Sequence, residues 1–133
     1  MKRFLVLFTL VGLLLNSQDV HAAETDMIKG YATAYNQTGT MATGSETRKG
    51  VCAGATEYSE KMIVLYQRLP DGSMGDYIGM YECLDTGGTD GLKSGVVIDV
   101  WQPSLDAVQD FADITYANEC KGRVYIQIID AKG

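Results

Sequence analysis

Two aspartates near the middle of the chain have the residue types and the setting that acid–base chemistry needs. Asp85 follows an apolar run and precedes Thr86 and two glycines, and Asp99 lies within the run VVIDVW. A strand sends alternate side chains to opposite faces, so Asp99 points the same way as Val97 and Trp101. Desolvation on such an apolar face raises the pKa of a carboxyl group and lets it hold a proton near neutral pH. A protonated carboxyl can donate to a leaving oxygen.

The same residues also admit a purely structural interpretation. An aspartate beside a turn often accepts backbone N–H groups and does no chemistry. Asp85 fits either role, whereas Asp90, in a glycine-flanked loop, is predicted to be a solvated turn residue. An ionised Asp85 close to Asp99 would raise the pKa of Asp99 further. We therefore take Asp99 as the candidate acid/base and Asp85 as its candidate partner.

Short β-prone segments separated by glycine-rich turns must position these carboxylates. The predicted strands lie at residues 31–36, 51–55, 62–69, 76–84, 95–101 and 122–130. The Pro-Asp-Gly turn at 70–72 predicts a hairpin between the third and fourth of them. A helix is predicted from apolar spacing over 104–114, with Ser104 as its N-cap and Leu105 and Phe111 on its apolar face. The chain is therefore predicted to be mainly β, a small closed six-stranded barrel with one late helix.

The N-terminus has the pattern of a secretory signal peptide. Lys2 and Arg3 precede an apolar run over 4–15 and small residues up to Ala22. We expect cleavage after Ala22, which leaves residues 23–133 as a single domain in the periplasm or outside the cell. A retained membrane anchor is the alternative, but the apolar run is short for a bilayer. After removal of the signal we expect no membrane association and a monomer.

Charge and histidine content exclude several classes of function. The chain carries a net charge of −6, which disfavours nucleic acid and anionic membranes as partners. His21 is the only histidine and lies in the predicted signal peptide. A Ser-His-Asp or Cys-His mechanism and a histidine-ligated zinc site are therefore excluded from the domain. We expect no cofactor and no metal, and acid–base chemistry must come from other side chains, carboxylates above all.

Three cysteines, Cys52, Cys83 and Cys120, remain in the predicted domain. Export to an oxidising compartment favours one disulfide, and an odd number leaves one thiol over. The sequence does not choose among the three pairings. Their spacing matches no metal-binding motif, and no histidine is present to activate a thiol.

Several motifs, taken in order, are similar to those of a known family. YATAY, TGSETRKGV, DTGG and GVVIDVW, then a helix and VYIQII, resemble the 3D (three-aspartate) domain of secreted bacterial cell-wall proteins and lytic transglycosylases. The resemblance implies a double-psi β-barrel that acts on peptidoglycan glycan strands. Such domains cleave between N-acetylmuramic acid and N-acetylglucosamine, and the muramoyl 6-hydroxyl attacks to leave a 1,6-anhydro end.

The resemblance assigns roles to individual positions. Asp85 matches the aspartate of the D-T-G-G motif, and Asp99 matches the aspartate of the I-D-hydrophobic strand, which is the catalytic acid/base by resemblance. The family's first aspartate is not matched, because Ala55 falls on its position. Glu57, two residues further on, is the carboxylate nearest in sequence that can replace it.

Two other classes of function remain open. LDTGGTD also resembles the Asp-Thr-Gly loop of retroviral-type aspartic proteases, but that interpretation leaves the IDVW strand unexplained. A non-catalytic wall-binding module is the third possibility, in which aromatic side chains stack on sugar rings. The candidates for such stacking are Tyr31, Tyr35, Tyr58, Tyr77 and Trp101.

Overall fold

The computed structural model describes residues 27–87 and 90–130, and the predicted signal peptide at 1–22 lies outside these described residues. Six strands close into one barrel in the order β1-β5-β2-β4-β3-β6. They are β1 (Met27–Tyr35), β2 (Val51–Gly54), β3 (Met62–Arg68), β4 (Met74–Thr86), β5 (Val97–Trp101) and β6 (Arg123–Ile129). This confirms the mainly β class with six strands. The double-psi form of the barrel stays a prediction.

The predicted strands match the observed ones, with differences at their ends. β1 begins at Met27, four residues before the predicted start, and β4 runs for 13 residues from Met74. β3 and β4 form the predicted antiparallel hairpin. At its turn the backbone N–H of Ser73 donates to Asp71 Oδ1 at 3.0 Å, so an aspartate side chain closes the turn.

The helices differ from the expectation in two respects. α3 (Leu105–Tyr116) is the predicted late helix, and the backbone N–H of Ala107 donates to Ser104 Oγ at 3.1 Å as an N-cap should. Leu105 was predicted to lie on the apolar face, but it is 71% exposed because the helix packs through Phe111 instead. Asp90, predicted to be a loop residue, begins the single-turn helix α2 (Asp90–Lys93) and is exposed. Within the described residues, no helix is long and apolar enough to cross a membrane.

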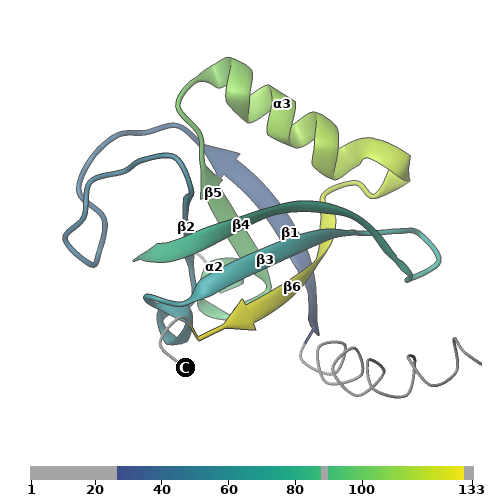
Figure 1. Cartoon of the computed structure of the whole chain (residues 1–133), viewed down its shortest axis with the longest axis horizontal. Coiled ribbons are helices and arrows are strands. Elements are labelled where there is room, and N and C mark those ends of the chain that lie inside the picture. Colours follow the sequence, from purple (N-terminus) through teal and green to yellow (C-terminus); the bar gives the residue numbers. More distant parts are fainter. Residues whose placement is uncertain (1–26, 88–89, 131–133) are drawn as a thin grey trace, which may run out of the picture.

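The barrel interior is the main hydrophobic core. Alternation along β5 sends Ile98 and Val100 inward, where both are fully buried. Phe111 of α3 belongs to the same cluster, and α3 lies along one side of the barrel (Figure 1). Asp99, Val97 and Trp101 therefore lie on the outer face of the wall, as one alternating set. The apolar surroundings that the sequence predicts for Asp99 are outside the barrel, not in its core.

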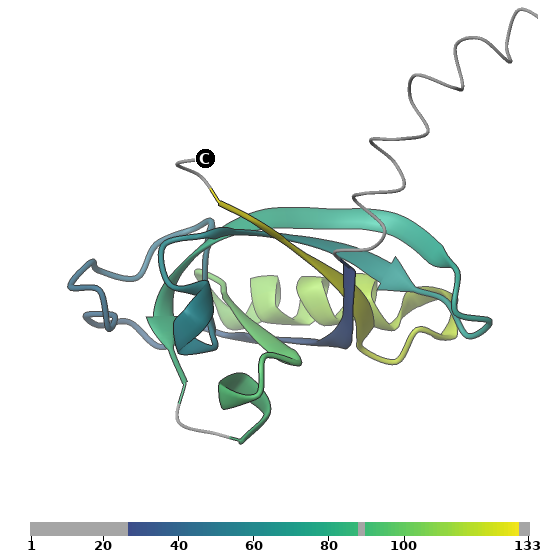
Figure 2. The ribbon, with the colours of Figure 1, turned by 90° about the horizontal axis from the view of Figure 1, so that it is seen from below.

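A second apolar cluster lies outside the barrel, under the connection between β1 and β2. Met41 from this connection packs with Val51, Leu84 and Trp101, and Tyr35 packs against them. The indole N–H of Trp101 donates to the carbonyl of Gln37 at 2.8 Å, which ties the connection to β5. Figures 1 and 2 show this connection, residues 36–50, extending from the barrel at the end away from the β3–β4 hairpin. We call residues 36–50 the covering loop.

The three cysteines are free and fully buried. Cys52 and Cys83 are register partners on the parallel strands β2 and β4. The interaction between the Cys52 and Cys83 side chains, and then burial, raises the pKa of Cys52 well above its ordinary value. Of the three pairings that the sequence leaves open, Cys52 with Cys83 is therefore the one with neighbouring sulfur atoms.

Candidate active site

Three adjacent strands bring Asp85 and Asp99 into one row across the barrel wall. β5, β2 and β4 are neighbours, and Ala53 of β2 is the register partner of Asp99 on one side and of Asp85 on the other. Register partners in a sheet point to the same face. The two carboxylates therefore lie on the outer face with a small methyl side chain between their strands. Their backbones are separated by two strand spacings, about 10 Å.

A β-bulge in β4 brings Asp85 to that face. Cys52 pairs with Cys83 and the next residue, Ala53, pairs with Asp85, so Leu84 is an extra residue in β4. Simple alternation would send Asp85 to the same side as Cys83, into the core. The extra residue changes the side that every following residue faces. The bulge is therefore the local feature that lets Asp85 share a face with Asp99.

Asp99 is half-buried and has one hydrogen-bond donor. Thr33 Oγ1, from the neighbouring strand β1, donates to Asp99 Oδ1 at 2.8 Å. Burial raises the pKa of Asp99 above its ordinary value, the bond from Thr33 opposes this shift, and the charge of Asp85 adds to it. The other oxygen, Oδ2, has no hydrogen-bond partner among the described residues, so it is the atom that can hold and transfer a proton.

Asp85 has a different environment, because backbone N–H groups occupy its carboxylate. Oδ1 accepts from the N–H of Ala42 at 3.0 Å and from the N–H of Thr86 at 2.9 Å. Ala42 belongs to the covering loop, so Asp85 fastens the loop to the barrel. The structural role that the sequence allowed for Asp85 is present in the fold.

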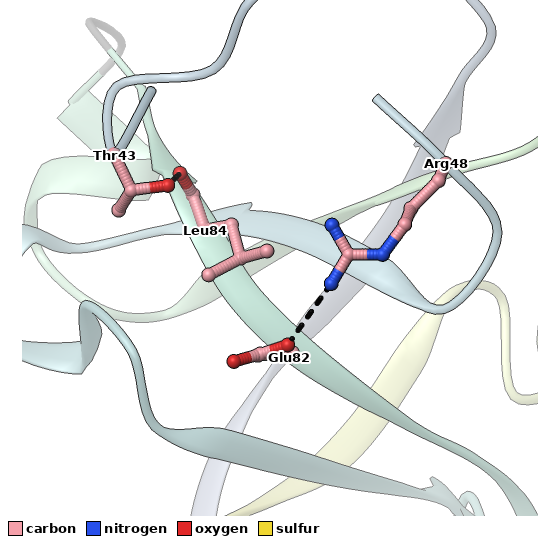
Figure 3. Close-up of polar contacts among 4 residues, drawn as sticks. All are labelled: Thr43, Arg48, Glu82 and Leu84. Atoms are coloured by element: carbon pink, nitrogen blue, oxygen red, sulfur yellow. Dashed lines mark hydrogen bonds and ion pairs between the residues drawn. The ribbon is translucent and has the colours of Figure 1, made fainter. Parts of the chain in front are cut away.

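Further contacts hold the covering loop against β4, and Figure 3 shows two of them. Thr43 Oγ1 donates to the carbonyl oxygen of Leu84 at 2.8 Å, which uses the backbone at the bulge. Arg48 forms an ion pair with Glu82 at 3.2 Å. The loop is thereby fastened to β4 at the bulge and just before it.

Tyr35, at the end of β1, lies between the site and the outer apolar cluster. Its hydroxyl oxygen is buried and has no hydrogen-bond partner among the described residues. Burial, and then the charges of Asp85 and Asp99, raise its pKa to about 12. Its hydroxyl therefore keeps its proton at neutral pH and can donate a hydrogen bond.

The position expected for a third carboxylate is not part of this row. Ala55 is 1% exposed and packs in the barrel core with Tyr58. Glu57 is exposed on the 3-10 helix η1 (Thr56–Tyr58), and its charge acts on the pKa of Tyr58 after the larger effect of burial. Neither the position of Ala55 nor the side chain of Glu57 joins the row of Asp99, Ala53 and Asp85.

Thr33 and Tyr35 are the site residues that sequence reasoning missed as members of the site. They belong to YATAY, for which the sequence indicated a strand, a family resemblance and, at Tyr35, a candidate for stacking on sugar rings, but no contact with Asp99. A signal was present, because alternation along β1 places Tyr31, Thr33 and Tyr35 on one face. The missing information was the neighbour of β1 in the sheet, which is β5 with Thr33 opposite Asp99.

A separate pocket of about 230 Å³ lies between β1 and α3. Ala32, Ala34 and Phe111 are among the residues that line it. Ala32 and Phe111 belong to the barrel core and Ala34 packs against it, whereas the Thr33 hydroxyl points to Asp99 on the outer face. Thr33 also lines the pocket, so the pocket adjoins the site at Thr33, but neither Asp85 nor Asp99 is among its lining residues.

Within residues 27–87 and 90–130, no three histidine, cysteine, aspartate or glutamate side chains cluster closely enough to hold a metal ion. The groups with chemical capability at the site are the Asp99 carboxyl, the Asp85 carboxylate and the Tyr35 phenol. This arrangement can donate a proton, accept one back and hold a polar ligand beside the acid. No family model, no curated protein and no solved structure matches the chain.

Proposed function

We propose that the protein is a peptidoglycan-cleaving enzyme of the lytic transglycosylase type in the cell envelope, with Asp99 as its acid/base. The observation that carries the proposal is the environment of Asp99. Burial raises its pKa, Thr33 holds one of its oxygens, and the other oxygen has no partner among the described residues. A carboxyl group in this state is suited to general acid catalysis. The resemblance to the 3D domain family supplies the substrate class and the double-psi form of the barrel.

The reaction needs only one carboxyl group that acts twice. Asp99 gives its proton to the glycosidic oxygen as the bond from that oxygen to the muramoyl C1 breaks. The muramoyl 6-hydroxyl oxygen then bonds to C1, and its proton returns to the Asp99 carboxylate. The 1,6-anhydro ring closes without water, so the second carboxylate of an ordinary glycosidase is not required. This accounts for a working site without an acidic residue at Ala55.

Asp85 and Tyr35 support Asp99 in this scheme. The negative charge of Asp85 favours the protonated form of Asp99, which is the form that begins the reaction. The same charge stabilises positive charge that develops on the sugar ring as the bond breaks. The buried Tyr35 hydroxyl keeps its proton and has no partner among the described residues, so it is a further donor near both carboxylates.

A non-catalytic wall-binding module is the second candidate, and one observation favours it. Asp85 uses Oδ1 to accept two backbone N–H groups, so part of the acidic constellation maintains the covering loop. A binding module would keep this loop without needing proton transfer. No comparable observation favours the aspartic protease, because the carboxylate beside Asp85 is Asp99 of the same chain.

The test is product analysis on isolated glycan strands. Purified protein is incubated with the strands, and the products are measured by mass, with Asp99→Asn and the exposed-site control Asp90→Asn in parallel. We expect 1,6-anhydro ends from the wild type and from Asp90→Asn, and none from Asp99→Asn. Binding of the strands without new ends would overturn the proposal in favour of the binding module. Peptide cleavage blocked by a pepsin-type inhibitor would overturn it in favour of the protease.

A further inference from the structure

The outer faces of β1, β6 and β3 carry a surface that the proposed chemistry does not use. Alternation and register place its members on one face: Lys29 is opposite Tyr125, Tyr31 is opposite Arg123, and Tyr125 is opposite Tyr66. Arg68 lies against two of these rings, as described next. We call this set the basic tyrosine face: Lys29, Tyr31, Tyr66, Arg68, Arg123 and Tyr125.

Arg68 is the fixed centre of the basic tyrosine face. Its guanidinium carbon lies 5.7 Å from the ring centre of Tyr31 and 6.0 Å from that of Tyr125. Its Nε donates to the carbonyl of Val124 at 3.1 Å, and another nitrogen donates to the carbonyl of Gly30 at 3.0 Å. The positive charge is therefore held in place before any ligand arrives, which lowers the entropic cost of binding.

The charge of this face differs from that of the whole protein. The chain is acidic, with a net charge of −6, yet Lys29, Arg68 and Arg123 gather here. None of the three forms an ion pair within the part of the chain that the structure describes. Tyr31 is 49% exposed, so much of its surface is open to a ligand. An acidic partner with flat apolar surfaces complements such a face.

β1 connects this face to the candidate active site. Tyr31 and Thr33 are on the same side of β1, and two residues of strand span about 7 Å. Thr33 is the residue that donates to Asp99. A chain-like ligand that lies on Tyr31 therefore continues directly to the acid.

We infer that the basic tyrosine face binds an anionic glycan strand and guides it along β1 to Asp99. This inference rests on the proposed function, because the continuity of the face with Asp99 is what selects a sugar chain. Sugar rings offer apolar C–H faces to the tyrosine rings, and carboxylates on the strand pair with Arg68 and its neighbours. Nucleic acid is the less favourable polyanion, because the face has only three basic residues and the protein as a whole is negatively charged, which repels a phosphate backbone.

Binding measurements in the Asp99→Asn background test this inference, because that variant leaves the strand uncleaved. The probe is peptide-free peptidoglycan strands, which carry free lactyl carboxylates. A neutral chito-oligosaccharide, which has the same linkage and no carboxylates, is the comparison probe. We expect Tyr31→Ala to weaken binding of the anionic strand roughly tenfold. Tyr116→Ala, which removes a 60% exposed tyrosine from α3, should leave binding unchanged.

The charge contribution has its own variant and control. Lys29→Ser should weaken binding of the anionic strand and reduce its salt dependence, whereas Lys93→Ser on α2 should not. The neutral oligosaccharide should bind more weakly and without salt dependence. Equal effects of Tyr31→Ala and Tyr116→Ala would overturn the inference, and so would equal binding of the two sugars. Displacement of the strand by a DNA oligonucleotide of matched charge would also overturn it, in favour of a general polyanion site.

These outcomes are separable from those of the proposed function. Cleavage by the wild type with no effect of Tyr31→Ala on binding would retain the enzyme and remove the binding face. Binding through Tyr31 and Lys29 without any anhydro product would retain the face and remove the enzyme.

Discussion

The two halves of the barrel wall differ in their strands and in what covers them. β1, β6, β3 and β4 pair antiparallel, and each has seven residues or more. β2 and β5 have only four and five residues, and two of the three pairings in their half are parallel. The covering loop packs on the short-strand half, whereas the long-strand half exposes tyrosines and basic side chains. Asp99, whose pKa burial raises, belongs to the short-strand half.

This difference separates two requirements of a glycan-cleaving protein. An acid that holds its proton needs partial burial, and Asp99 on the short strand β5 is half-buried. A long polymer needs an open surface, and the long-strand half supplies it at Tyr31. The site and the surface share one strand, β1, which contributes Thr33 to the first and Tyr31 to the second.

The largest expected effect comes from the acid itself. Asp99→Asn keeps the size of the side chain and removes the transferable proton, so activity on glycan strands should fall about 10²–10⁴-fold. Stability at neutral pH should not fall, because burial makes the ionised form of Asp99 unfavourable in the folded state. Initial rates and thermal unfolding are the measurements. Loss of activity together with a large loss of stability would place Asp99 among structural residues instead.

Asp85 should show the opposite pattern. Asp85→Ala leaves the N–H groups of Ala42 and Thr86 without their acceptor, which should lower the free energy of unfolding by about 0.5–1.5 kcal/mol. Amide hydrogen exchange should increase in the covering loop first. Asp85→Asn keeps an acceptor oxygen and should lose less stability. If both variants were as stable as the wild type, the covering loop would not depend on Asp85.

The sequence predicted those parts of the fold that depend on local patterns. Alternation gave the strands and the set of Val97, Asp99 and Trp101, and a polar residue before an apolar repeat gave the Ser104 cap. The bulge at Leu84 has no local signature, because it exists only when β2 pairs with β4. The partnership of Thr33 with Asp99 likewise depends on the strand order.

The exposed position of Leu105 has the same kind of cause. Helical spacing shows which residues share a face, but the packing partner decides which of them are buried. Here the barrel core takes Phe111 and leaves the first turn in solvent. The site residues in DTGG and IDVW were found because an aspartate next to apolar or glycine residues is visible in the sequence alone.

Thr33 gives a pH test of intermediate size. The folded-state pKa of Asp99 is raised above its ordinary value of 3.8. The protonated Asp99 therefore contributes its full stabilisation of the fold below pH 3.8. This stabilisation is lost as the pH rises through the raised pKa of the folded state. The bond from Thr33 opposes the shift, so Thr33→Val should raise the pKa of Asp99 further. The alkaline limb of the activity profile should move to higher pH, since the acid must be protonated. An unmoved limb, or one moved to lower pH, would show that Asp99 is not the acid that sets it.

The smallest expected change in stability comes from Tyr35, yet it separates the two candidate functions. Because its buried hydroxyl has no partner among the described residues, Tyr35→Phe should leave the free energy of unfolding unchanged or raise it by up to about 1 kcal/mol. If substrate uses this hydroxyl, the same variant should lose activity several-fold. A fold that keeps an unpaired phenol next to two carboxylates accepts a desolvation cost without structural gain. Equal activity and lower stability in Tyr35→Phe would instead give the hydroxyl a structural role and weaken the catalytic interpretation of the short-strand half.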